Sequence, residues 1–291
     1  MTTKKRRPTP DPRHLNRLPL ARSLKLHKKQ PLYEVAQCVL CDLFSQFITR
    51  LHTLGQSDDP ETVHQARVAW RRFKAALRLF KPVLATDMQQ PWQSLKALLK
   101  DLSALRDLDV ARLETLPPQS EAYVAGDVRR HARWQSMMDK LAQAADQQRH
   151  AVRQALQSTA AVSALVSTTQ WLEAIGNRAA GKDAREHGRH WLERRIRRLR
   201  DAMKKAARDD DSPQTLHHCR ILAKQVRYNV EILRPLLPKK QVKHWCDEST
   251  QLQTRIGALR DVQQASALVG CLGVDPELVE FLRGVAARTA H

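Results

Sequence analysis

The sequence predicts an all-α protein made of two related halves. From residue 32 onward, apolar residues recur at steps of three and four, which is the spacing of one face of an α-helix. No segment shows the alternation of apolar and polar residues that is typical of a half-buried strand. A helical segment at residues 61–82 recurs at residues 214–235, so that each position is matched 153 residues later. This repeat predicts an internal duplication.

In the first half, a break at residues 55–60 separates two helical patterns, with Asp59 as the expected N-cap and Pro60 at the first helical position. Pro117 and Pro118 mark a second break, and Gly176 is expected to end the last helix of this half. The helices predicted here span about residues 32–54, 61–81, 89–110, 121–156 and 162–175.

The second half repeats this plan. The sequence LSALRDLDV at residues 102–110 recurs as IGALRDVQQ at residues 256–264, and the pattern of the first helix recurs near residues 192–206. Three segments thus share one offset to within a residue or two, which indicates duplicated helical bundles. The expected halves are about 31–158 and 180–291, linked by the helix near 162–175, with further helices at 239–268 and 276–288.

Residues 1–30 are predicted to form a basic, flexible arm. They contain ten Lys or Arg residues, one acidic residue and four prolines, and they lack a sustained apolar period. Two interpretations of the arm stay open: it extends the electrostatic reach of the protein toward a polyanion, or it is merely solvated.

The charge of the chain predicts a polyanionic partner. Fifty Lys and Arg residues against thirty Asp and Glu residues give a net charge of +20, which suits nucleic acid, an acidic membrane surface or a phosphate polymer. A solvated basic surface is the alternative. A hydrophobic content of 42% excludes a disordered polycation, and no apolar run is long enough to insert into a membrane.

Cysteine usage indicates a cytoplasmic protein. The five cysteines are an odd number without the spacing of a disulfide framework, and no apolar segment typical of a secretion signal follows the basic N-terminus. Cys38 and Cys41 form a CxxC within an amphipathic helical run, where buried thiols are a better interpretation than a zinc site. We expect neither a metal nor a cofactor.

A stripe of cations beside a histidine is the candidate site on each repeated helix. At 100° per residue its members fall within roughly 80° of one another, next to the apolar face. Lys96 and Lys100 share one face of the next helix with Ser103 and Asp107, and Asp107 is expected to orient a neighbouring cation or histidine. The two stripes are His64, Arg67, Arg71, Lys74 and Arg78, and His217, Arg220, Lys224 and Arg227.

The chemistry of these side chains suits a chain of phosphates. One helical turn rises about 5.4 Å, so cations on a rigid helix are spaced at intervals close to those of such a polymer. Arginine binds phosphate oxygens bidentately, lysine adds a point charge, and histidine gains charge near a polyanion. A single stripe would be interpreted as a solvated face, but its doubling at a fixed spacing favours a binding site.

At these residues the chain resembles the CHAD family of histidine-containing α-helical domains. VHQARVAWRRFKAAL and LHHCRILAKQVRYNVEIL resemble the two signature helices, and the LRD segments resemble the second recurring motif, over about residues 32–291. The resemblance implies two four-helix bundles related by a pseudo-twofold axis around a basic central groove. It also implies binding of long-chain inorganic polyphosphate, with association with polyphosphate granules as an expected role. Members are often fused to a triphosphate-cleaving CYTH domain, which this sequence lacks, so a stand-alone binder is expected.

The ligand-contacting residues that the resemblance implies are eight members of the two stripes. Two departures from the repeat, Glu231 in place of Arg78 and Gln225 in place of Arg72, argue against equal contributions from the halves. The far end of the second stripe is therefore expected to be partly self-neutralised. The eight residues are His64, Arg67, Arg71, Lys74, His217, Arg220, Lys224 and Arg227.

Three other functions are alternatives to polyphosphate binding. An enzyme would use His64 and His217 as phosphoryl carriers or general acids, but no carboxylate cluster suited to Mg²⁺ and no Walker-type loop is present, so we expect no catalysis. Nucleic-acid binding explains the charge equally well, although an aromatic content of 5% provides few stacking platforms, so such binding is expected to be non-specific. A scaffold that docks to acidic protein or lipid is a third alternative.

Overall fold

The computed structural model describes residues 30–81, 84, 91–177, 184–208 and 213–288, and no β-strand occurs among them. For His217 and residues 252–260, among others, the description covers the backbone alone. The expected all-α class is confirmed. Apart from Gln30, the basic arm predicted for residues 1–30 lies outside the described residues.

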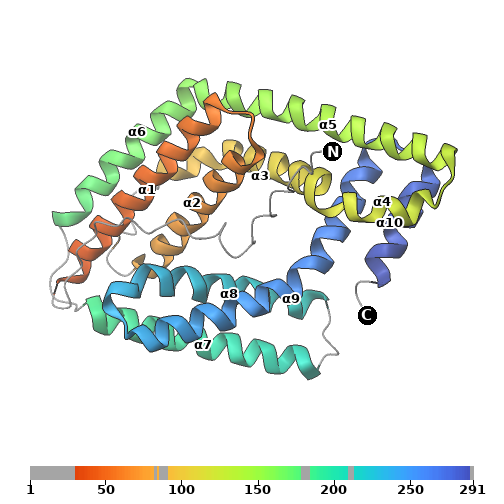
Figure 1. The fold of residues 1–291 in the computed structure, drawn as a ribbon. Coiled ribbons are helices and arrows are strands. Elements are labelled where there is room, and N and C mark those ends of the chain that lie inside the picture. Colours follow the sequence, from red (N-terminus) through yellow and green to blue (C-terminus); the bar gives the residue numbers. More distant parts are fainter. Residues whose placement is uncertain (1–29, 82–83, 85–90, 178–183, 209–212, 289–291) are drawn as a thin grey trace, which may run out of the picture.

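The first half contains six α-helices within the described residues, joined by short 3₁₀ turns and one π-helical turn (Figure 1). The helices are α1 (Leu32–Gln56), α2 (Pro60–Leu79), α3 (Lys96–Val110), α4 (Ser120–Val124), α5 (Val128–Gln157) and α6 (Thr159–Glu173). The 3₁₀ turns are η2 (Pro91–Leu95), η4 (Pro117–Gln119) and η5 (Ala174–Asn177), and the π-helical turn is η3 (Ala111–Thr115).

The second half begins with a long basic helix. Its elements are α7 (Ala184–Arg208), α8 (Pro213–Leu233), η6 (Arg234–Leu236), α9 (Lys239–Cys271) and α10 (Pro276–Arg288). The predicted bounds of α9 and α10 agree with these to within three residues. The break predicted before α8 lies partly outside the described residues.

The start of α2 is capped as the sequence predicts. The side chain of Asp59 accepts a hydrogen bond of 2.9 Å from the backbone N–H of Glu61, and Pro60 occupies the first helical position. The side chain thus binds one of the N–H groups that have no partner within the helix.

The single helix predicted over residues 121–156 is wrong, because the chain turns between α4 and α5. Ala125 and Gly126 have φ values of 45° and 80°, in the left-handed region that ends helices. Asp127 then caps the next helix by accepting hydrogen bonds from the backbone N–H groups of Arg129 and Arg130. The helix predicted over residues 89–110 is likewise divided, into η2 and α3.

An aromatic cluster packs behind α2 and fixes its position. The ring of Phe73 lies 5.0 Å from that of Phe44 in α1 and 6.2 Å from that of Trp92 in η2. Trp92 in turn contacts Trp171 of α6 at 4.6 Å. Burial of each of these side chains contributes about 1.5–3 kcal/mol, so the face of α2 opposite its cations holds the helix rigidly in the core.

The two halves share part of one core. A small cluster of buried residues joins α7, α8 and the beginning of α9, whereas Tyr228, Ile232 and Leu233 of α8 belong to the large cluster of the first half. Figure 1 shows α7, α8 and the first part of α9 lying together below α1 and α2. The two halves are therefore packed against each other through α8.

The last helix reaches back to the first half. Phe281 of α10 packs on Tyr123 of α4 at a ring distance of 5.2 Å, and Glu277 forms ion pairs with Arg130 and Arg133 of α5. In Figure 1, α10 accordingly lies beside α4, at the far end of α9. Among the described residues no helix is long and apolar enough to cross a bilayer.

Candidate functional site

The cationic stripe of α2 coincides with the face of this helix that is not buried. Between residues 63 and 80 the core takes up most positions, including Arg72 at 3% exposure. The residues of this span that are not fully buried are His64, Gln65, Arg67, Trp70, Arg71, Lys74 and Arg78. All five members of the predicted stripe are among them, with Lys74 and Arg78 the most exposed.

The stripes of α2 and α8 meet. The guanidinium of Arg71 lies 6.0 Å from the centre of the Tyr228 ring, and that of Arg227 lies 5.2 Å from the same ring. Arg227 and Arg106 of α3 are both close enough to His64 to affect its ionisation. We call this group the central cluster: His64, Arg67 and Arg71 of α2, Arg106 of α3, and Arg227 and Tyr228 of α8.

The cluster holds His64 in its neutral form. Burial, followed by the positive charges of Arg106, Arg71, Arg67 and Arg227, lowers the pKa of His64 from 6.5 to about 4. Both causes disfavour the imidazolium, since burial removes solvation and the arginines repel added positive charge. An anion placed among these side chains would relieve that repulsion.

Several guanidinium atoms in the cluster have unused donors. Arg67 Nη1, Arg71 Nε and Arg227 Nε are buried and have no hydrogen-bond partner among the described residues. Burial lowers the pKa of Arg67, while the nearby carboxylate of Asp107 raises it. Asp107 therefore lies next to a cation, as the sequence predicts. Donors that have lost water and gained no acceptor favour a ligand rich in oxygen.

Arg72 and Glu231, which have no charged counterpart of the same sign in the other repeat, contact each other. Arg72 Nη2 lies 3.2 Å from Glu231 Oε2, with 4% and 21% of the two side chains exposed. Glu231 Oε1 also lies 3.8 Å from Arg227 Nε. The expected partial neutralisation at the far end of the second stripe is confirmed.

A second group of cations lies at the C-terminal end of α2. Partial burial and the charges of Arg78 and Lys96 lower the pKa of Lys74. Arg78 also lies close to Arg195 of α7, whose pKa is lowered by burial and by Arg198, Arg78 and Arg194. We call this group the peripheral cluster: Lys74 and Arg78 of α2, Lys96 of α3, and Arg194, Arg195 and Arg198 of α7.

The remaining predicted site residues are placed less centrally. Arg220 and Lys224 are half-buried on the side of α8 that carries Arg227. Lys100 is exposed on α3, and no described contact joins it to either cluster. His217 lies within α8, and its side chain is outside the described part of the chain.

Comparison with known proteins identifies the family. The family model of the CHAD domain matches residues 39–270 of the sequence. The chain belongs to the CHAD domain family. The crystal structure of the CHAD domain from the plant Ricinus communis is similar, with a TM-score of 0.78 and 26% sequence identity over 92% of this chain and 89% of that chain.

A second solved structure shows the same fold. PptA from Streptomyces chartreusis has a TM-score of 0.61 and 17% identity, covering 90% of this CHAD chain and 95% of that chain. A search of curated proteins found no match.

Five residues of the two clusters in this CHAD protein were not predicted from the sequence. Arg106 belongs to the repeated LRD segment, so its recurrence was a usable signal. Arg194, Arg195 and Arg198 belong to the arginine-rich run of α7, in which only the apolar positions entered the prediction. Tyr228 offered no signal, because nothing in the pattern of α8 indicates which of its side chains contacts Arg71.

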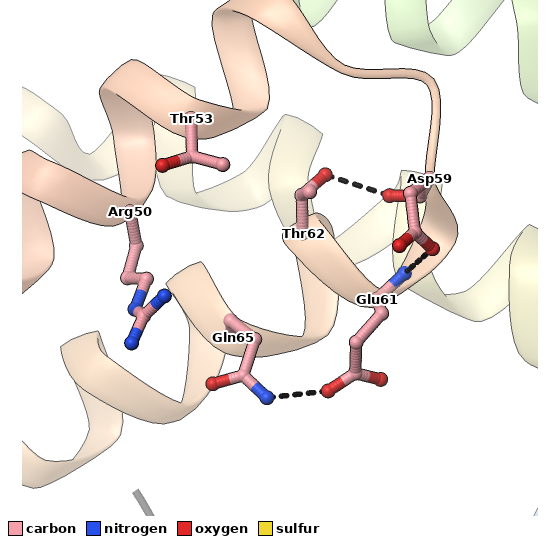
Figure 2. A pocket seen from close by; sticks show the side chains of 6 residues that line it. All are labelled: Arg50, Thr53, Asp59, Glu61, Thr62 and Gln65. Atoms are coloured by element: carbon pink, nitrogen blue, oxygen red, sulfur yellow. Dashed lines mark hydrogen bonds between the residues drawn. The ribbon is translucent and has the colours of Figure 1, made fainter.

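A pocket elsewhere on this CHAD domain has a different character. It lies between α1 and the start of α2 and is lined by Arg50, Thr53, Asp59, Glu61, Thr62 and Gln65 (Figure 2). Glu61 and Asp59 are engaged there, since Gln65 donates to the Glu61 carboxylate and Thr62 donates to the Asp59 carbonyl oxygen. Two carboxylates make this pocket unsuitable for a polyanion. Within the described residues no group of His, Cys, Asp and Glu side chains could hold a metal ion.

Proposed function

We propose that this CHAD protein binds long-chain inorganic polyphosphate along the cationic stripes of α2 and α8. The observation that carries the proposal is the meeting of the two stripes in the central cluster, where cations from three helices surround a neutral His64. Two stripes on opposite surfaces would not have formed one site.

The burial of the guanidinium groups and their unused donors favour a flexible polyanion with closely spaced charges. Buried guanidinium donors without acceptors gain most from a ligand that presents an oxygen to each of them. A phosphate chain carries several acceptor oxygens in every unit and can follow a stripe along a helix. Because the aromatic cluster holds α2 in place, the cations are already arranged for the ligand and lose little freedom on binding.

The proposal includes a pseudo-twofold relation between the halves and a basic groove between them. The order α1, α2, α3 is repeated by α7, α8, α9, and each member of the first set lies about 153 residues before its counterpart. The last helix, α10, packs on α4 and α5 of the first half. The proposed symmetry therefore applies to three pairs of helices, which are α1 with α7, α2 with α8 and α3 with α9. A superposition of the two sets in an experimental structure, with polyphosphate lying between α2 and α8, would support this part.

The proposed activity is binding without cleavage, in the cytoplasm and at polyphosphate granules. Incubation of the protein with polyphosphate and Mg²⁺ or Mn²⁺ should release no phosphate and leave the chain length unchanged. Shortened chains would replace this proposal with an enzymatic one, in which His64 becomes the first candidate for a general acid or phosphoryl carrier.

The test of binding is a titration with polyphosphates of graded length, with duplex DNA, RNA and heparin as competitors. Affinity should fall as salt rises, because association releases condensed counterions. Displacement of polyphosphate by nucleic acid at matched charge concentration would favour the nucleic-acid alternative.

A variant with four cations of the stripes removed tests the site itself. Arg67→Ala, Arg71→Ala, Arg220→Ala and Lys224→Ala together should lower polyphosphate affinity by about a hundredfold, since each charged hydrogen bond contributes roughly 1.5–3 kcal/mol before losses from non-additivity. The control removes four exposed cations outside the stripes: Arg129, Arg197, Arg208 and Lys240. Equal loss in both variants would contradict the site, and circular dichroism should show unchanged helicity in both.

A further inference from the structure

The start of α7 is fixed against the end of α2 and α8. His187 Nε2 lies 3.0 Å from the carbonyl oxygen of Leu79, the last residue of α2. One residue later, Gly188 packs so closely on Leu233 of α8 that an added Cβ would lie 2.8 Å from a methyl carbon of Leu233. The position of α7 relative to the end of α2 is therefore set by packing.

From this anchor, α7 directs arginine side chains toward the cationic end of α2. Arg195 lies two turns beyond His187 and stacks on Trp191, with its guanidinium 4.8 Å from the ring centre. This stacking holds the side chain in one orientation at a half-buried position. Arg194 and Arg198 of the same helix and Arg78 of α2 lie near enough for their charges to lower the pKa of Arg195.

The peripheral cluster is short of carboxylates. No described ion pair involves any of its six cations, and the nearby Glu193 pairs instead with Arg189, at 3.7 Å. Every charged neighbour that affects the pKa of Lys74 or Arg195 is a cation. Like charges from three helices that are held together without a carboxylate repel one another, so an anion bound among them would be stabilising.

The two clusters lie on one continuous path along α2. Fourteen residues separate His64 from Arg78, which corresponds to about 21 Å along the helix axis. Arg71 and Lys74 occupy the same stripe between them. A tripolyphosphate is too short to reach both clusters, whereas a longer chain can contact them at the same time.

We propose that α7 supplies a second anion-binding segment of the site, in which Arg194, Arg195 and Arg198 join Arg78 and Lys96 to bind the same linear polyphosphate that the central cluster binds. The inference rests on the proposed function and extends it to α7, a helix that carries neither of the two stripes. Simultaneous contact with both clusters raises the effective concentration of the second contact, so affinity should depend on chain length.

The test uses the full-length protein and two probes, tripolyphosphate and a long polyphosphate chain. The variant is Arg195→Gln with Arg198→Gln. Its matched control is Arg197→Gln with Lys204→Gln, which removes two exposed charges of the same helix at about 160–180° from Arg195. A further variant, Arg194→Gln with Arg198→Gln, leaves the Arg195–Trp191 stack intact and so guards against a loss of folding.

The α7 variants should bind the long chain about tenfold more weakly and should bind tripolyphosphate as the wild type does. For the long chain, the slope of log affinity against log salt concentration should correspond to roughly one fewer phosphate contact or more. Equal weakening by the control, or unchanged binding of the long chain, would overturn the role of α7 and leave the central cluster as the site. If the wild-type protein bound neither probe, the proposed function itself would fall and this inference with it.

Discussion

Arg72 and Glu231 form a largely buried ion pair between α2 and α8, with 3.2 Å between Nη2 and Oε2. They stand at two of the positions where the repeated helices depart from each other in charge: Arg72 matches Gln225, and Glu231 matches Arg78. Each departure alone would be unfavourable, since one places an arginine in the core and the other places an acid in a cationic stripe. Together they compensate for each other and connect the two halves.

The first prediction is that Glu231→Gln lowers stability and raises polyphosphate affinity. Loss of the carboxylate removes one partner of the buried Arg72 charge, which costs about 3–5 kcal/mol in a fully buried pair and about 2–3 kcal/mol here, where Glu231 is partly exposed. The same change frees Arg227 from its neighbouring carboxylate and so strengthens its attraction for phosphate. Urea unfolding and a polyphosphate titration measure the two effects.

A double-mutant cycle separates this pair from general packing. Arg72→Met with Glu231→Leu should recover at least half of the stability lost in Glu231→Gln, because the double variant no longer buries a charge at position 72. A double variant less stable than Glu231→Gln would contradict the assignment of the loss to the buried charge.

The second prediction concerns Tyr228 as a positioning residue. Its ring contacts the guanidinium groups of both Arg71 and Arg227, each contact contributing about 0.5–2 kcal/mol. Tyr228→Leu should therefore weaken polyphosphate binding by about five- to tenfold, as measured by calorimetry. Tyr228→Phe keeps the ring face and removes a hydroxyl that has no described hydrogen-bond partner, so it should change affinity less than twofold.

Thermal unfolding distinguishes positioning from folding in this pair of variants. If Tyr228→Leu lost stability but kept full affinity, the ring would have only a packing role. If Tyr228→Phe lost affinity as strongly as Tyr228→Leu, the hydroxyl and not the ring would be the group that matters.

The sequence predicted most of the helices and the cationic stripe of α2, because both follow from local rules. The helical period places Arg67 and Arg71 on one face whatever surrounds the helix, and Asp59 with Pro60 marks its start. The turn at Ala125 and Gly126 was missed, since the apolar period continues across it, although Gly126 followed by Asp127 is a usable signal for the end of one helix and the start of the next.

The composition of the site could not be predicted to the same extent. Whether Arg106, Tyr228 or Arg195 approaches α2 depends on the crossing of α3, α7 and α8, and helix periodicity carries no information about such crossings. The pKa of His64 shows the consequence. A stripe drawn on α2 alone includes Arg67 and Arg71, whereas the largest charge effect on His64 comes from Arg106 of another helix.

The third prediction is a loss of stability in mild acid that depends on His64. Its pKa is about 4 in the folded protein and about 6.5 in an unfolded chain, so the unfolded chain binds the proton more readily between these values. Stability is therefore fully present above pH 6.5 and falls as the pH drops toward 4. The full shift would correspond to about 3 kcal/mol, and partial exposure reduces the expected loss to about 2 kcal/mol.

His64→Gln isolates this contribution, because glutamine stays neutral throughout. The free energy of unfolding should fall between pH 7 and pH 4.5 in both proteins. This fall should be about 2 kcal/mol smaller in the variant than in the wild type. An identical pH dependence in the two proteins would show that the arginines around His64 do not suppress its protonation.

The fourth prediction links binding to proton uptake. A bound polyphosphate offsets the charges of Arg67, Arg71, Arg106 and Arg227, which are among the causes that hold the pKa of His64 near 4. The pKa should therefore rise on binding, so the complex takes up a proton that the free protein does not. Affinity for polyphosphate then increases as the pH falls from the His64 pKa of the complex toward 4. The increase is up to about tenfold for each unit by which binding raises this pKa.

Nuclear magnetic resonance of labelled histidine measures both pKa values directly, with and without polyphosphate. The control is the pH dependence of affinity in His64→Gln, which retains the other histidines and should have a smaller slope than the wild type. A polyphosphate in the central cluster would offset the arginine charges that help to lower the pKa of His64, so an unchanged value in the complex would place the polyphosphate away from this cluster. A raised value with no difference in slope between the two proteins would mean that another group takes up the proton that accompanies binding.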